Sequence, residues 1–396
     1  MKKLLSLILT LALLAGCVSA LADDTKYTMT IDGVNLQNAP DRGIVASDEA
    51  MEDNPLIEGE SPTTGRPADT SERYMPMLVQ ISNPETNVKV NGKTVQLAGV
   101  STKSPWGGQY ADIVYEGILY RSGQTRITFL FNDSFAEGQP VSAGPVRSAR
   151  IGHVLLREEW QGGIVYAGGP RAEENDIAAM FNELGASKKG VTFNLLDNSY
   201  TEFKNRNKFV KAPDNYNVNV AGIRTLVPET TEAQPHPFLF ADESPYTADK
   251  YDQAYSINLD WGHKKYVSHF YYDESTGTYA RYMGDVPYVT YLTEPAKGVE
   301  TTPMTFNNVI IQRVGYEYTN NSKIMPVMQS VGSGNADIFI NGRYIAGYWV
   351  RENIKAPTVY LDDQGNEIQL SRGRTFIAHF PPESLLTYNA ENRCPD

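Results

Sequence analysis

The sequence contains little cysteine: its 396 residues include only Cys17 and Cys394. A scaffold held together by several disulfides is therefore excluded, and so is a zinc ribbon, whose metal ligands are mostly thiolates. Basic residues are also scarce, because 35 Lys and Arg stand against 47 Asp and Glu, a formal net charge of −12. This balance argues against a protein that binds nucleic acid through a basic face. Apolar residues still make up 41% of the chain, which is enough for a packed core.

The common catalytic motifs are missing as well. The sequence has neither the G-x-S-x-G elbow of serine hydrolases nor the H-E-x-x-H pattern of zinc proteases. Its five histidines are scattered, and we interpret them as structural or surface residues. We therefore expect no metal and no cofactor, and the sequence leaves open whether the protein is an enzyme.

A long hydrophobic run occurs at the N-terminus. A short basic segment (residues 1–3) precedes an apolar run at 4–14, which is shorter than the about 20 residues of a membrane span and is typical of a secretory signal. The run leads into Leu-Ala-Gly-Cys at 14–17, which resembles the bacterial lipobox, where the cysteine is lipidated. A competing cleavage site for ordinary signal peptidase is Ala-Leu-Ala at 20–22. We expect a lipid on Cys17 that anchors the protein at the extracytoplasmic face of the cell membrane; the alternative is a secreted protein.

The remaining chain divides into parts of different composition. Residues 1–22 hold the signal and lipobox, and residues 23–72 are rich in acidic and small polar residues, a composition that predicts a flexible tether. Residues 73–245 mix strand and helix patterns, which predicts an α/β-like domain with a mixed sheet. Residues 246–390 alternate between apolar segments and turn residues, which predicts a β-rich antiparallel domain. The predicted fold class is therefore α+β.

Several elements can be placed from local patterns. Residues 88–95 alternate around Asn91-Gly92, a strong signal for a two-residue hairpin turn. A strand at 164–167 leads through two glycines into a predicted helix that opens at Pro170 and carries apolar residues on one face up to position 184. In the second half we expect strands at residues 266–272, 278–283, 306–318, 337–340, 344–351, 359–361, 367–370 and 375–380.

The most unusual string in the chain is Gly-Pro-Val-Arg-Ser-Ala-Arg at residues 144–150. It places Arg147 and Arg150 at a predicted helix start, where Ser148 can cap the helix. The N–H groups of a helix N-terminus carry partial positive charge, and guanidinium groups beside them suit a carboxylate or a phosphate. The alternative is that both arginines pair with acids and hold two layers together.

Two carboxylates precede this string in the sequence. Asp112 and Glu116 lie on one face of a predicted strand, because side-chain direction in a strand has a period of two. Such a pair can act as general acid and base. It can equally neutralise Arg126, Arg147 and Arg150 in a buried charge network.

A second loop offers further candidates. Gly168, Gly169 and Arg171 follow a predicted strand and precede a predicted helix, the position at which α/β sheets bind ligands. The loop lacks both the G-x-G-x-x-G pattern and the lysine of a P-loop, so a nucleotide is not the expected ligand.

Three strings together resemble the YerB-type bacterial lipoproteins, a family described as a domain of unknown function. They are Ala-Asp-Ile-Val-Tyr-Glu at 111–116, Thr-Arg at 125–126 and the string at 144–150, and the likeness extends over most of residues 75–380. The resemblance implies a two-part extracytoplasmic lipoprotein, and it does not supply a reaction.

The chain departs from this family at one position. The family often has Ala-Pro-His-Asn where this chain has Ala-Pro-Asp-Asn at 212–215. The resemblance thus indicates Asp214 and Asn215 as candidate ligand-binding residues, with an aspartate in place of the histidine.

We expect, from these observations, a membrane-anchored envelope protein whose first domain binds an anionic ligand such as a peptidoglycan fragment or another envelope component. The candidate ligand-binding residues are Asp112, Glu116, Arg126, Arg147, Ser148, Arg150, Gly168, Gly169, Arg171, Asp214 and Asn215. One alternative is an envelope hydrolase that uses Asp112, Glu116 or Asp214 in acid–base chemistry. Another is an interaction module that binds no small ligand.

Overall fold

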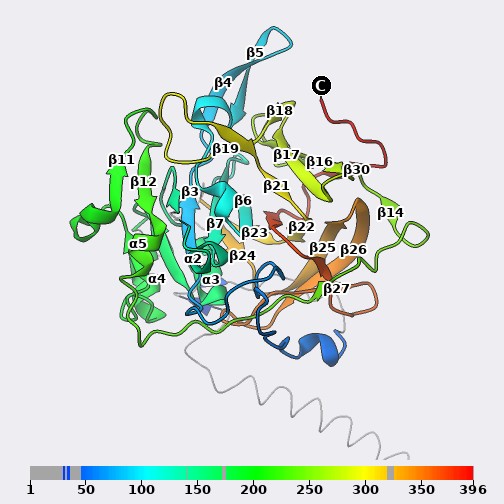
Figure 1. Cartoon of the computed structure of the whole chain (residues 1–396), viewed down its shortest axis with the longest axis horizontal. Coiled ribbons are helices and arrows are strands. Elements are labelled where there is room, and N and C mark those ends of the chain that lie inside the picture. Colours follow the sequence, from blue (N-terminus) through cyan, green and yellow to red (C-terminus); the bar gives the residue numbers. More distant parts are fainter. Residues whose placement is uncertain are drawn as a thin grey trace, which may run out of the picture.

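The computed structural model describes residues 46–139, 141–171, 175–318 and 325–395, together with the short strands β1 (Thr30–Ile31) and β2 (Val34–Asn35). The predicted signal, Cys17 and the first part of the predicted tether therefore lie outside the described residues, apart from these two strands. Strands predominate in the described part, and its helices are few and short (Figure 1). The predicted α+β class is confirmed. No helix in the described ranges is both long and apolar enough to cross a membrane.

A large mixed sheet forms the centre of the molecule (Figure 1). Its strands, in spatial order, are β10 (Thr192–Asn194), β9 (Gly163–Tyr166), β3 (Met77–Ile81), β7 (Thr125–Phe131), β6 (Ile113–Ile118), β29 (Thr375–Phe380), β22 (Asn308–Arg313), β25 (Gly332–Ile340), β26 (Arg343–Arg351) and β14 (Asp252–Gln253), with β27 (Val359–Asp362) also paired to β26. Strands β6 and β29 pair in parallel, so the sheet continues from the first half of the chain into the second. The division into domains at 73–245 and 246–390 stays a prediction, but both parts supply strands to this sheet.

The central strands β3, β7 and β29 are buried at every position. Their apolar, β-branched and aromatic residues suit strands that are covered on both faces. On one face, Trp160 of helix α3 (Ile151–Trp160) donates a hydrogen bond to the hydroxyl of Tyr115 on β6. On the other face, Phe376 of β29 contacts Phe270 of a second sheet, with ring centroids 4.8 Å apart. The central sheet is therefore enclosed between α3 and that second sheet.

The second sheet is antiparallel and comes from the second half of the chain. It contains β18 (Val286–Pro287), β17 (Thr278–Met283), β16 (Val267–Asp273), β15 (Ser256–Asp260), β30 (Leu386–Asn389) and β21 (Thr305–Phe306). Smaller pairings are formed by β4 (Glu85–Val90) with β5 (Lys93–Ala98), β8 (Ser142–Ala143) and β11 (Lys204–Arg206) with β12 (Tyr216–Asn219), β13 (Phe240–Ala241) with β28 (Leu370–Ser371), β19 (Val289–Tyr291) with β20 (Thr301–Pro303), and β23 (Gly315–Glu317) with β24 (Val327–Gln329).

The helices are α2 (Asp133–Ala136), α3, α4 (Ile177–Glu183) and α5 (Val220–Arg224), with the 3₁₀ turns η2 (Glu49–Met51), η3 (Ser101–Lys103), η4 (Gly108–Tyr110) and η6 (Asn198–Phe203). The predicted helix after β9 exists as α4, but its start at Pro170 was wrong. The helix begins only at Ile177, because the side chain of Asp176 caps it by accepting a hydrogen bond from the Ala179 N–H. The β9–α4–β10 unit confirms the predicted strand–loop–helix order.

The predicted hairpins are also present. Strands β4 and β5 meet at Asn91-Gly92, where both residues have positive φ, the backbone that a two-residue type I′ turn requires. The expected strands at 278–283 and 375–380 are found with those bounds as β17 and β29. The strand expected at 367–370 is reduced to the two residues of β28.

The tether prediction does not hold for residues 46–72, because this segment packs against the folded body. Ser61, Thr63 and Thr64 are buried, and the hydroxyls of Ser61 and Thr64 each donate a 2.6 Å hydrogen bond to the carboxylate of Asp133. A polar composition indicates solvation only when the polar groups lack partners in the fold. Here the hydroxyls of Ser61 and Thr64 have the carboxylate of Asp133 as their partner, which the composition does not reveal.

Candidate functional site

Arg126, Arg147 and Arg150, which we call the arginine cluster, lie around the N-terminus of α3. Arg126 is on β7, and the loop at residues 144–150 carries the other two. This loop lies between two strands: the Arg147 N–H donates to the carbonyl of Gln80 on β3, and the Arg147 carbonyl accepts from the N–H of Ala167 just after β9. Arg126 joins the loop through a 2.9 Å hydrogen bond from its Nη1 to the carbonyl of Ser148.

The cluster carries more positive charge than its neighbours neutralise. Arg147 pairs with Asp214 at 3.7 Å, and its side chain is 31% exposed. Within the described ranges no carboxylate pairs with Arg126 or Arg150; the latter donates to the carbonyl of Ala149 and to the hydroxyl of Tyr120. Burial, followed by the positive charges of Arg150 and Arg147, lowers the pKa of Arg126 to about 9. The guanidinium groups thus repel one another, and an added anion would relieve that repulsion.

The structure differs from the prediction in the role of Ser148 and in the role of the glycine loop at residues 168–169. Ser148 does not cap α3: Arg150 occupies the N-cap position, and the Ser148 hydroxyl donates to the carbonyl of Ala167. Gly168 has a φ of +80°, and its carbonyl accepts from the Ala149 N–H, so the glycine loop supports the arginine loop. Gly169, the next residue, lies against Ile177, where a Cβ would meet that side chain at 3.1 Å.

Arg171 is not brought into the cluster. It is exposed, and no contact joins it to Arg147 or Arg150 in the part of the chain that the structure describes. The prediction that Arg171 lies at a helix start is therefore wrong, because α4 begins six residues later at Ile177.

Asp214 contacts the arginine cluster through Arg147, whereas Asn215 has a different role. Besides its contact with Arg147, Asp214 accepts a 2.8 Å hydrogen bond from the Ser82 hydroxyl. Asn215 is buried; it donates to the carbonyl of Asn207 and accepts from Arg206. It thus holds the loop between β11 and β12, and it does not face the arginine cluster through any contact in the described residues.

Glu116 forms a buried ion pair with an arginine that the sequence analysis did not single out. Its Oε2 lies 2.6 Å from Nη2 of Arg281 on β17, and neither side chain is exposed. Asn83, Thr125 and Ser268 donate further hydrogen bonds to the same carboxylate. The predicted charge network therefore exists, but its cation comes from the second sheet and not from the arginine cluster.

Asp112 is buried at a separate place. Its Oδ2 accepts hydrogen bonds from the hydroxyl of Thr63 and from the N–H of Asp133. Burial, followed by the negative charge of Asp133, raises the pKa of Asp112 well above its ordinary value. Asp112 and Glu116 have different partners and are both shielded from solvent, so the structure does not support their prediction as an acid–base pair.

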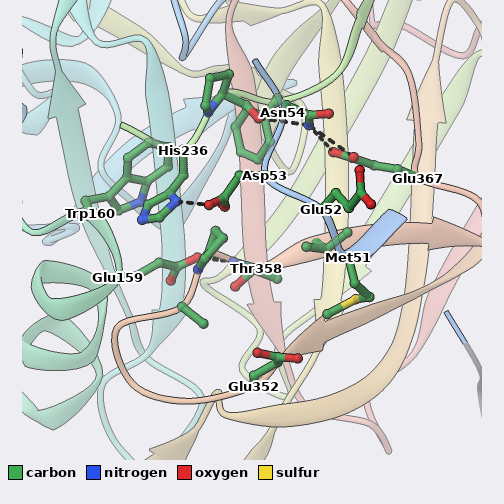
Figure 2. A pocket seen from close by; sticks show the side chains of 15 residues that line it. Met51, Glu52, Asp53, Asn54, Glu159, Trp160, His236, Glu352, Thr358 and Glu367 are labelled. Atoms are coloured by element: carbon green, nitrogen blue, oxygen red, sulfur yellow. Dashed lines mark hydrogen bonds and ion pairs between the residues drawn. The ribbon is translucent and has the colours of Figure 1, made fainter. Parts of the chain in front are cut away.

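A second candidate feature is an acidic cavity of about 240 Å³ between η2, the C-terminal end of α3 and the segment after β26 (Figure 2). Its carboxyl groups are those of Glu52, Asp53, Glu159, Glu352 and Glu367. Glu159 accepts a hydrogen bond from the Thr358 N–H and lies 3.3 Å from Arg351. No sequence pattern indicates this cavity, because its lining comes from segments that are far apart in the chain, and one of them lies in the predicted tether.

Glu367 makes the acidic cavity sensitive to pH. Burial raises its pKa to about 7, although two hydrogen bonds from Asn54 act in the opposite direction. The folded state therefore binds this proton more tightly than the unfolded chain does. We expect the resulting stability to be present below about pH 4.5 and to be lost as the pH rises toward 7. Urea unfolding between pH 4 and 8 should show a larger loss of stability in the wild type than in Glu367→Gln; an equal loss in both proteins would contradict the assignment.

No group of three or more His, Cys, Asp or Glu side chains within the described ranges is placed to hold a metal ion. Cys394 is free and exposed near the C-terminal end. The arginine cluster therefore remains the site in which the most predicted residues meet.

Comparisons with known proteins agree with this fold. A family model described as "Protein of unknown function (DUF3048) N-terminal domain" matches residues 100–275, and one described as its C-terminal domain matches residues 257–377. The crystal structure of the YerB protein from Bacillus subtilis is similar, with a TM-score of 0.59 and 21% identity over 83% of this chain and 99% of that chain. At this identity the likeness concerns the fold alone. No curated protein matches the chain.

Proposed function

The chain belongs to the YerB-type family of DUF3048 proteins of unknown function, and from this premise we propose that it is a lipid-anchored envelope protein that binds an anionic ligand on the extracytoplasmic face of the cell membrane. The ligand we propose is a cell-wall fragment with free carboxylates. The binding residues would be Arg147 and Arg150 of the arginine cluster, while the buried Arg126 would add positive charge behind them.

One observation carries this proposal: three guanidinium groups meet at a helix N-terminus, and a single carboxylate, that of Asp214, pairs with them in the described residues. A structural network would supply an acid for each buried arginine, as Glu116 does for Arg281. Arg147 and Arg150 are half-buried, so they can donate hydrogen bonds to a ligand from solvent. A bound carboxylate would gain charge-assisted hydrogen bonds and would reduce the repulsion within the cluster.

The contacts of the candidate acids favour this proposal over the hydrolase alternative. Asp112 and Glu116 are buried behind other partners, and Asp214 is held by Arg147 and Ser82. The proposal is tested by titrating the full chain with a disaccharide tripeptide from peptidoglycan, for the wild type and for variants of Arg147 and Arg150. A protein that binds no such fragment at all would fit a structural interaction module better.

The lipid anchor gives a separate prediction. The string at residues 14–17 motivates it, because the cysteine directly follows the apolar run of the signal. We expect Cys17→Ala to release the protein from the membrane fraction or to leave an uncleaved precursor, as seen by fractionation and immunoblotting. Mass spectrometry that finds a wild-type N-terminus at Asp23 would contradict lipidation and would favour cleavage after Ala22.

A further inference from the structure

A small pocket lies beneath the arginine cluster, between β6, β7, β29 and the first turn of α3. Its lining includes Arg126, Arg150, Gly152, His153, Met328 and His379. The pocket has a volume of about 20 Å³. Since a water molecule needs about 10–15 Å³, the pocket has room for a single occupant of about that size.

The charged groups that line this pocket are positive and incompletely paired. Arg126 is only 6% exposed, and its Nε is buried without a hydrogen-bond partner in the described residues. The Nε of Arg150 is likewise buried without a hydrogen-bond partner in the described residues. A buried guanidinium without a counter-charge is costly, and the cost rises when a second one lies beside it. A buried negative charge between them would offset that cost.

The two histidines of the pocket do not add charge to it. Burial, followed by the charge of Arg351, lowers the pKa of His379 to about 3. Burial and the charges of Arg126 and Arg150 hold the pKa of His153 well below its ordinary value. The Nδ1 of His153 accepts a 2.9 Å hydrogen bond from the Arg150 N–H, so its single proton lies on Nε2, where it can be donated.

The backbone of α3 supplies a further donor. Gly152 lines the pocket in the first turn of the helix, where an N–H group has no carbonyl acceptor within the helix. Guanidinium, imidazole and backbone N–H groups thus line the pocket beside the apolar side chains of Ile118, Leu156 and Pro326, and its described lining contains no carboxylate.

We propose that this pocket binds one monovalent, halide-sized anion, with chloride as its occupant. The positive charge of the two guanidinium groups favours an anion over a water molecule, and the small volume favours a monatomic one. A phosphate or sulfate is too large, and a wall fragment cannot enter. The site is independent of the proposed function, because it would neutralise the buried side of the cluster whatever binds to the exposed side.

The test compares thermal unfolding of the purified full chain in sodium gluconate with that in chloride, bromide, acetate or sulfate, at constant ionic strength. We expect chloride and bromide to raise the melting temperature in a saturable manner, because a ligand that binds only the folded state stabilises it. Acetate and sulfate should not do so. Arg126→Gln should abolish the chloride effect, and the exposed Arg171→Gln should retain it.

A second variant, Gly152→Ala, keeps every charged side chain of the pocket and reduces the volume in which an anion could bind. In Gly152→Ala the new Cβ would lie 2.8 Å from Cε of Met328, which would narrow the pocket, while alanine suits the helix. This variant should also lose the chloride effect while remaining folded. Crystals soaked in bromide should show an anomalous peak between Arg126 and Arg150. Equal melting temperatures in all salts, an unchanged chloride effect in Arg126→Gln, or an effect of acetate without one of chloride would overturn the proposal.

Discussion

Arg281→Met is expected to lower the free energy of unfolding by about 3–5 kcal/mol, because it removes one partner of a fully buried ion pair. Glu116 would remain between the two sheets with no cation in contact and with three neutral donors around it. The guanidinium also lies over the ring of Tyr288, 4.0 Å from its centroid, and that contact would be lost as well. Chemical denaturation of both proteins under the same conditions measures the difference.

The control is the double variant Arg281→Met with Glu116→Gln, which removes both charges. This double variant should recover a large part of the lost free energy of unfolding, since the uncompensated buried charge of Glu116 is the main cause of the destabilisation. The exposed pair of Arg393 and Glu391 offers a matched comparison, and Arg393→Met should leave stability nearly unchanged. A small effect of Arg281→Met would show that the pair does not connect the two sheets as described.

Arg150→Ala is expected to give the opposite pattern: a large loss of ligand binding with little change in stability. Binding of an acidic wall fragment should weaken by about 1.5–3 kcal/mol for each charged hydrogen bond that is lost. That corresponds to roughly 10-fold or more in the dissociation constant. In sodium gluconate, without chloride, stability should change little, because Arg150 has no acid partner in the described residues and repels Arg126.

Arg147→Ala should behave similarly, since its contact with Asp214 is long and partly exposed. Arg171→Ala is the matched control, because this exposed arginine lies outside the cluster and should change neither property. Unfolding and binding are measured on the same preparations. A stability loss of about 3–5 kcal/mol in Arg147→Ala or Arg150→Ala, with unchanged binding, would support a structural network in place of a binding site.

Local features of this fold could be predicted from the sequence. The turn at Asn91-Gly92 requires positive φ at two adjacent residues, and the apolar face of α4 repeats with the helical period. The string at 144–150 also indicated a helix start with arginines at its N-terminus, which the structure contains. These signals are short-range, so one sequence is enough to show them.

Long-range partners could not be predicted in the same way. Glu116 and Arg281 are 165 residues apart in the chain, and Asn54 and Glu367 are 313 apart. Charge and composition limit the type of partner but do not select one among many arginines or acids. The same limitation explains why residues 46–72 were predicted to be a tether, since their polar side chains bind carboxylates supplied by distant segments.

Calorimetric titration of the full chain measures directly whether the arginine cluster binds an anionic ligand. The titrant is the disaccharide tripeptide, and the proteins are the wild type and the double variant Arg147→Ala, Arg150→Ala. We expect saturable binding by the wild type that weakens with added salt and is absent in the variant. Equal affinity in the two proteins, or no binding by the wild type, would contradict it.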